Sequence, residues 1–170
     1  MKQRTSVFRA RAVLLVLVIS LSFLLGVTAA SCTVSPTSTT SDGLEDVVIT
    51  LERTACKGIC PVYKVTVTGN GTVIYEGRDF VKTTGRVESS ISEEKIKQLI
   101  SEFNDIDYFS LNDSYTERVI TDAPDAITSI ILDGKTKTIQ HYHGDLNAPE
   151  ELTELENRID EIVNSAQWIE

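Results

Sequence analysis

The sequence is poor in positive charge. Its 170 residues include 16 Lys and Arg against 25 Asp and Glu, which gives a formal net charge of -9. Four of the basic residues, Lys2, Arg4, Arg9 and Arg11, lie before residue 12, so residues 32–170 carry 12 basic against 25 acidic side chains, a balance of -13. A strongly acidic surface repels phosphate backbones and anionic headgroups. The composition therefore argues against a nucleic-acid partner and against direct binding to a lipid surface.

The sequence also lacks the short motifs that mark common catalytic sites. It contains no G-x-S-x-G nucleophile elbow, no phosphate-binding loop and no H-E-x-x-H metalloprotease motif. Acidic residues are abundant, but no two of them are singled out as an acid/base pair. We therefore identify no catalytic residue, and the sequence favours a protein without enzymatic activity.

One long apolar run is present, at residues 12–27, between the basic N-terminus and the small residues 28–31. This order of segments is typical of a secretory signal peptide. The motif Ala29-Ala30-Ser31-Cys32 resembles the lipobox of bacterial lipoproteins, although Ala29 stands where leucine is usual. That resemblance implies that Cys32 is lipidated and that the chain is cut before it. The alternative is an uncleaved membrane anchor formed by the same run.

These features predict three segments. Residues 1–31 are a lipoprotein-type signal peptide, residues 32–46 are the lipidated Cys32 and a Ser/Thr-rich tether, and residues 47–170 are a single domain. The domain is expected to be exported and held at the bacterial cell membrane or outer membrane by the lipid on Cys32. It would then face the periplasm or the exterior.

The domain alternates between strand and helix patterns. Strand patterns occupy residues 47–51, 63–67, 72–76, 126–132 and 136–143, with a weaker pattern over 79–91 that breaks at Gly85. Asn70-Gly71 and Asp133-Gly134 predict tight hairpin turns. Helices are predicted after Ser92 and after Pro149, each opening with two glutamates. We expect an α+β fold, an antiparallel β-sheet built from hairpins with two helices packed on one face.

Cys56 and Cys60 form a C-x3-C pair between two predicted strands. In an exported protein such a pair is expected to form a disulfide, and Gly58 permits the backbone reversal that brings the two Cβ atoms together. A dithiol oxidoreductase is disfavoured, because those enzymes place C-x-x-C at a helix N-terminus.

His141 and His143 allow a second interpretation of the cysteines. Two residues apart on a strand, their imidazoles project from the same face. Together with Cys56 and Cys60 they would make a Cys2His2 set suited to zinc or copper. The simpler interpretation is two solvent-exposed histidines at a strand end, with no cofactor.

From Cys56 onward the sequence resembles the bacterial domain-of-unknown-function family 6438. The residues that carry the resemblance are Cys56-x-Gly58-x-Cys60-Pro61-Val62-Tyr63, Gly71-Thr72-Val73, Tyr75, Gly77, Tyr115, Asp122-Ala123-Pro124, His141-Tyr142, Leu155-Glu156, Ile159-Asp160 and Trp168. They extend over nearly the whole region after the tether. The resemblance implies one domain and no particular activity.

Taken together, these observations lead to one functional hypothesis. We expect a membrane-anchored lipoprotein that acts as a non-catalytic binding or accessory module of the cell envelope, with an envelope protein or a small ligand as its partner. The alternative is a metal-binding protein that uses Cys56, Cys60, His141 and His143.

Overall fold

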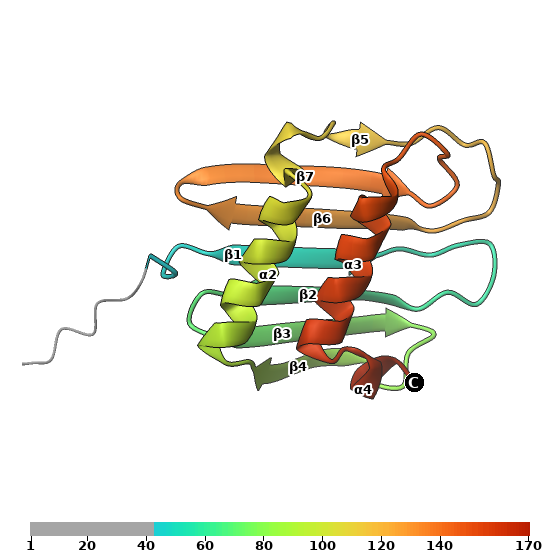
Figure 1. Ribbon diagram of the computed structural model, residues 1–170. Helices are drawn as coiled ribbons and strands as arrows, with labels where there is room; N and C mark the ends of the chain where they lie inside the picture. The colour runs from blue at the N-terminus through green and yellow to red at the C-terminus, as the bar shows by residue number, and fades with distance from the viewer. Residues whose placement is uncertain (1–42) are drawn as a thin grey trace, which may run out of the picture. The chain divides into compact units, whose positions relative to one another are not determined.

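A computed structural model describes residues 43–170, and the predicted signal peptide, Cys32 and most of the tether lie outside these residues. The described part contains a seven-stranded sheet in the order β4-β3-β2-β1-β6-β7-β5 (Figure 1). Its strands are β1 Val48–Arg53, β2 Val62–Thr68, β3 Thr72–Asp79, β4 Gly85–Ser90, β5 Ser114–Tyr115, β6 Asp125–Leu132 and β7 Lys135–Tyr142.

Two helices, α2 Glu93–Asp105 and α3 Glu150–Val163, cross the same face of the sheet (Figure 1). A short helix, α4 Ala166–Ile169, and a 3-10 turn, η1 Tyr108–Ser110, complete the domain. The predicted α+β class is confirmed. The parallel pairing of β5 with β7 was not predicted, because a two-residue strand is too short to show a period. Within residues 43–170 no helix has the length and apolar character needed to cross a membrane.

Both predicted tight turns are present. Gly71 has a φ of +89°, which a residue with a side chain rarely adopts. The Asn70 side chain accepts hydrogen bonds from the Thr72 backbone N–H at 3.0 Å and from the Thr68 hydroxyl at 2.7 Å. At the second turn Asp133 and Gly134 have φ values of 51° and 71°, as a hairpin with two left-handed residues requires.

The core fills the space between the sheet and the two long helices. Alternation along β1 points Ile49 and Leu51 toward the helices, where both are fully buried. Trp168 of α4 stacks on Tyr75 of β3, with ring centroids 4.9 Å apart, and Tyr75 in turn stacks on Tyr63 of β2 at 5.7 Å. These contacts fasten the end of the chain to the sheet.

The two ends of the sheet differ in the length of their connections. One end carries the loops 54–61, 80–84, 116–124 and 143–149, and we call it the loop end (right in Figure 1). The opposite end has the hairpin turns after β2 and β6, and the chain reaches β1 there from residue 43. The loop end therefore faces away from the side on which the tether joins the domain.

Candidate functional site

The loop between β1 and β2 is closed by the predicted disulfide. Cys56 and Cys60 are bonded to each other, with their Cα atoms 5.7 Å apart. The Gly58 backbone N–H donates to Cys56 Sγ at 3.3 Å, within the bridged loop. Ile59, at the tip, is 83% exposed. The disulfide thus holds a projecting apolar side chain in a short, constrained loop.

Large apolar side chains are exposed only in the four loops of the loop end, among the residues that the structure describes. We call them the apolar tips: Ile59, Phe80, Val119, Ile120 and Leu146. Burying such side chains is favourable by about 1.5–3 kcal/mol each, so leaving five of them in water at one end of a domain is costly. Grouped exposed apolar residues are typical of interaction surfaces.

Backbone contacts join neighbouring loops. The Lys57 N–H donates to the Asp122 carbonyl at 3.4 Å, and the two side chains form an ion pair at 3.5 Å. The Ile120 N–H donates to the Gly144 carbonyl at 3.0 Å. Loops 54–61, 116–124 and 143–149 therefore form one continuous surface. Loop 80–84 is tied to α4 instead, since the Thr83 N–H donates to the Trp168 carbonyl at 2.9 Å.

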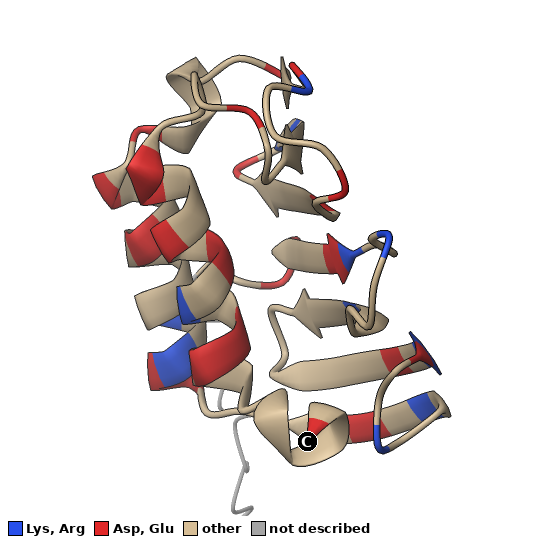
Figure 2. Ribbon diagram, turned by 90° about the vertical axis from the view of Figure 1, so that its right-hand side faces the viewer, with Lys and Arg blue, Asp and Glu red and all other residues tan. Residues whose placement is uncertain are grey.

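The loop end differs from the helices in its charge balance, since acidic residues outnumber basic ones along α2 and α3 but not in the loops. Lys57, Lys82 and Arg118 are exposed in its loops, whereas α3 contains six acidic residues and a single arginine. Figure 2, which looks onto the loop end, shows both basic and acidic residues in the loops and mainly acidic residues along the helices. The Arg118 guanidinium lies over the Tyr142 ring, 4.4 Å from its centroid. The apolar tips thus lie among charges of both signs, because the same loops also carry Glu117, Asp122 and Asp145.

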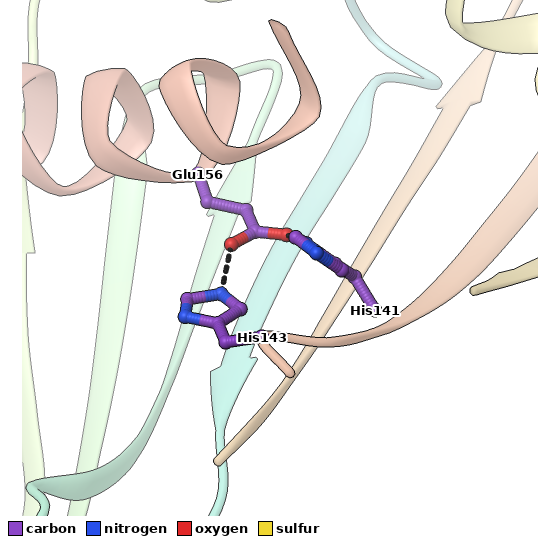
Figure 3. Close-up of side chains that lie close together, drawn as sticks. All are labelled: His141, His143 and Glu156. Atoms are coloured by element: carbon purple, nitrogen blue, oxygen red, sulfur yellow. Dashed lines mark hydrogen bonds and ion pairs between the residues drawn. The ribbon is translucent and has the colours of Figure 1, made fainter. Parts of the chain in front are cut away.

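Beneath the loop end, a buried carboxylate joins α3 to the sheet. The Glu156 side chain has no exposed surface, and its two oxygens contact different histidines (Figure 3). His141 Nδ1 lies 2.8 Å from Oε1 and His143 Nε2 lies 2.7 Å from Oε2. Arg53 of β1 approaches the same carboxylate, with Nη1 3.6 Å from Oε2. A charged group is rarely buried in this way unless it is paired.

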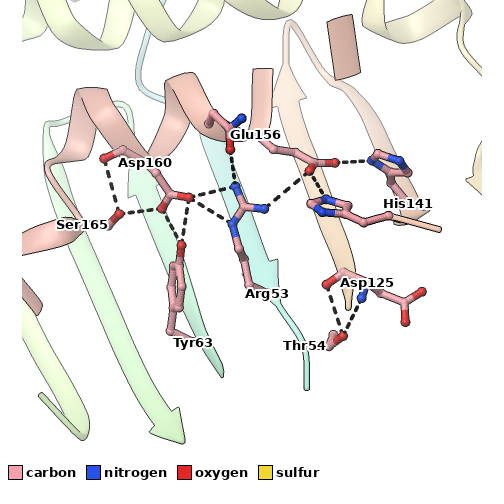
Figure 4. A network of polar contacts seen from close by, with 10 residues as sticks. Arg53, Thr54, Tyr63, Asp125, His141, Glu156, Asp160 and Ser165 are labelled. Atoms are coloured by element: carbon pink, nitrogen blue, oxygen red, sulfur yellow. Dashed lines mark hydrogen bonds and ion pairs between the residues drawn. The ribbon is translucent and has the colours of Figure 1, made fainter. Parts of the chain in front are cut away.

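A second carboxylate, Asp160, lies one turn further along α3. It accepts hydrogen bonds from Arg53 Nε at 3.0 Å and from the Tyr63 hydroxyl at 2.8 Å (Figure 4). The Ser165 hydroxyl donates to its other side at 2.6 Å. Arg53 therefore lies between two carboxylates of one helix, and together they connect β1, β2 and β7 to α3.

The environment of Glu156 favours its ionised form. Burial is the largest influence on this carboxyl and would raise its pKa. The hydrogen bonds from His141 and His143, together with their charges, outweigh burial and hold the pKa of Glu156 below its usual value. Burial and the nearby Asp160 raise the pKa of Tyr63, so its hydroxyl remains a donor.

The structure tests the sequence-based prediction for the histidines. Their side chains share a face, as predicted, with ring centroids 4.8 Å apart. The interpretation as two solvent-exposed residues is wrong, because His141 is 3% exposed and His143 lies half-buried against Glu156. The cysteines do not join them: within residues 43–170 the grouped metal-ligating side chains are His141, His143 and Glu156.

Sequence reasoning missed Arg53 and Glu156, although signals for both were present. Arg53 continues the inward-facing series of Ile49 and Leu51, so the alternation itself turns its guanidinium toward the core. Glu156 lies four residues after Leu152, on the apolar face of α3. A charge on an apolar face indicates a buried partner, but not which one.

Comparisons with known proteins give the family of the chain. A comparison with curated proteins returned no match. The model of the family described as domain of unknown function (DUF6438) matches residues 47–163, well over half of the chain. The matched region includes the disulfide loop and the Glu156 cluster, by which we mean His141, His143 and Glu156. The chain therefore belongs to the DUF6438 family.

Proposed function

We propose that this protein is a lipid-anchored component of the bacterial cell envelope whose domain is a non-catalytic binding module. The signal-like N-terminus and the motif ending at Cys32 support the anchor. The observation that carries the binding role is the gathering of the apolar tips at the loop end, on the side away from residue 43. A tethered domain in this arrangement presents its apolar side chains away from its own attachment point.

The size and chemistry of the loop end favour a protein partner. Its loops follow the sheet from β3 to β7, four strand spacings of about 4.8 Å each, or roughly 20 Å. A surface of that width suits a protein better than a small ligand, and its apolar residues among charges of both signs match a partner surface of the same mixed kind. We therefore assign a second envelope protein, with an apolar contact surface flanked by charged residues, as the partner.

Two features limit the loss of conformational freedom on binding. The Cys56–Cys60 disulfide constrains the loop that carries Ile59. Phe80 is held at a φ of 53°, a left-handed conformation that is unusual for an aromatic residue. A surface that is already ordered loses less entropy on association, so more of its contact energy contributes to affinity.

The anchor is tested by metabolic labelling in the native cell. The wild-type chain should take up an alkynyl fatty acid, and Cys32→Ser should take up none. Labelling of both chains, or of neither, would contradict the lipid anchor. A matched substitution in the tether, Ser38→Ala, should leave labelling unchanged.

The binding surface is tested by photocrosslinking from defined positions. A photoreactive residue at Ile59 or Leu146 should form a discrete adduct with one envelope protein, whereas one at Lys135, the first residue of β7 at the opposite end of the sheet, should not. The partner is then purified, and its affinity for the chain should fall at least tenfold with Ile59→Asp and stay constant with Lys135→Ala. Equal adducts from both ends, or an affinity insensitive to Ile59→Asp, would reject this surface.

A further inference from the structure

We infer that His141, His143 and Glu156 form a binding site for one divalent transition-metal ion, with Zn²⁺ and Cu²⁺ as the best-suited ions. The three ligand atoms come from β7, the residue after it and the facing helix α3, and all lie within 4.8 Å of one another. Metal–nitrogen and metal–oxygen bonds of about 2.1 Å place neighbouring ligand atoms about 3 Å apart. The two observed contacts, 2.8 Å and 2.7 Å, are already in that range.

The charge around the cluster favours a cation. Arg53 contributes one positive charge, whereas Glu156, Asp160 and the buried Asp145 contribute three negative ones. With neutral histidines the group has a formal charge of -2, which a divalent ion balances. Asp145 lies close enough to His141 for the two to interact electrostatically, and its own oxygens accept the backbone N–H groups of Glu117 and Asn147 at 2.8 Å and 2.9 Å.

The ligand types suit a borderline metal ion. Two imidazole nitrogens and one carboxylate oxygen are the set that Zn²⁺ accepts when it retains an open position, and Cu²⁺ binds nitrogen and oxygen ligands more tightly than the other first-row divalent ions. A bound metal would replace the two hydrogen bonds to Glu156 by taking the lone pairs of His141 Nδ1 and His143 Nε2, and each ring would then carry its proton on the other nitrogen. Cys56 and Cys60 are not available as thiolate ligands, because they are joined in the disulfide.

Access and outer contacts are consistent with such a site. The His143 side chain is 24% exposed, whereas the other two ligands are buried, so an ion enters from the side of loop 143–149. Arg53 contacts the Glu156 oxygen that faces His143 and fixes the carboxylate from outside. The His143 backbone N–H donates to the Pro124 carbonyl at 3.0 Å, which positions the ring beyond the end of β7.

The test is a calorimetric titration of the purified, detergent-solubilised full chain with ZnCl2 or CuCl2. One ion per chain should bind with micromolar or tighter affinity. Glu156→Gln and His143→Gln should each weaken binding at least 100-fold, whereas Glu151→Gln, an exposed change on the same helix, should not. Co²⁺ bound in the same site should give visible d–d absorption that Zn²⁺ abolishes.

The folding of each variant is checked by circular dichroism and thermal melting before titration. If Glu156→Gln does not fold, His143→Gln decides the question, because its ring is partly exposed. No stoichiometric binding by the wild-type chain, or binding that His143→Gln leaves unchanged, would overturn the metal site. The cluster would then be an ionic clamp between α3 and the sheet. Neither result affects the proposed binding role of the loop end, which rests on other residues.

Discussion

Arg53 directs both Nε and Nη2 at one carboxylate oxygen of Asp160, each from 3.0 Å. The pair joins the central strand β1 to α3 across 107 residues of sequence. Both side chains are largely buried, with 16% and 19% exposure, so removing one partner leaves the other charge poorly solvated. Tyr63 shares the same carboxylate, and its hydroxyl would also lose a charged acceptor.

Asp160→Asn should therefore destabilise the domain. The penalty for breaking a buried ion pair is about 3–5 kcal/mol, and partial exposure reduces the expectation here to about 2 kcal/mol. Urea unfolding, followed through the fluorescence of Trp168, measures the change. Asp133→Asn, in an exposed turn where Asn is tolerated, should change stability by less than about 0.5 kcal/mol. Equal effects of the two substitutions would contradict the role of the Arg53 pair.

Glu156 predicts a defined pH dependence of stability. Its pKa in the folded state lies below the ordinary value of 4.5, so the folded state binds this proton less readily than the unfolded state. The stability that Glu156 contributes is therefore fully present above pH 4.5 and is lost as the pH falls through the folded-state pKa. Melting temperatures between pH 7 and pH 3 should fall more steeply for the wild-type chain than for Glu156→Gln. Glu151→Gln, the matched control, should keep the wild-type slope, and parallel curves for all three chains would refute this assignment.

The disulfide predicts a chemical result and an energetic one. Without reductant, Cys56 and Cys60 should take up no alkylating reagent in denaturant, and after reduction both should be modified, as peptide mass spectrometry can show. Closing such a short loop stabilises the folded state by about 2 kcal/mol in the chain-entropy model. The double variant Cys56→Ser, Cys60→Ser should therefore unfold at lower urea concentration. Alkylation of either cysteine without reductant would contradict the disulfide.

Alanine substitutions at two glycines with positive φ, Gly71 and Gly134, distinguish the cost of backbone strain from the cost of a steric clash. A Cβ at Gly71 would lie 2.6 Å from the Ile91 carbonyl oxygen, whereas one at Gly134 would meet nothing within 4 Å. Gly134→Ala should cost about 1 kcal/mol, the usual strain of a left-handed alanine. Gly71→Ala carries that strain and the clash, so it should be at least about 1 kcal/mol worse, measured by denaturant unfolding. Similar losses at the two sites would show that the β2–β3 turn can shift to make room.

The sequence predicted those features that depend on residues close together in the chain, and not those that depend on residues far apart. Alternation in β1 and β2, the Asn70-Gly71 turn and the apolar spacing of α3 are local, and each predicted its element. The Glu156 cluster could not be assembled in the same way, because its partners come from β1 and from the end of β7. Strand pairing places Arg53 and His141 on either side of Ala126, and the crossing of α3 brings Glu156 to both. No local pattern encodes these long-range contacts. The C-x3-C pair was interpreted correctly because its partners are four residues apart.

The position of β1 has a consequence for how the chain acquires its structure. β1 pairs with β2 on one side and with β6 on the other, and the second pairing joins Val48 to Ile131. Until residues 125–132 are available, β1 is an open edge with unpaired backbone groups, a known template for aggregation. A chain threaded across a membrane from its N-terminus delivers the first four strands well before β6. If the chain is exported as we propose, the domain depends on protection of that edge during export, and a truncated chain ending at α2 should aggregate where the full chain folds.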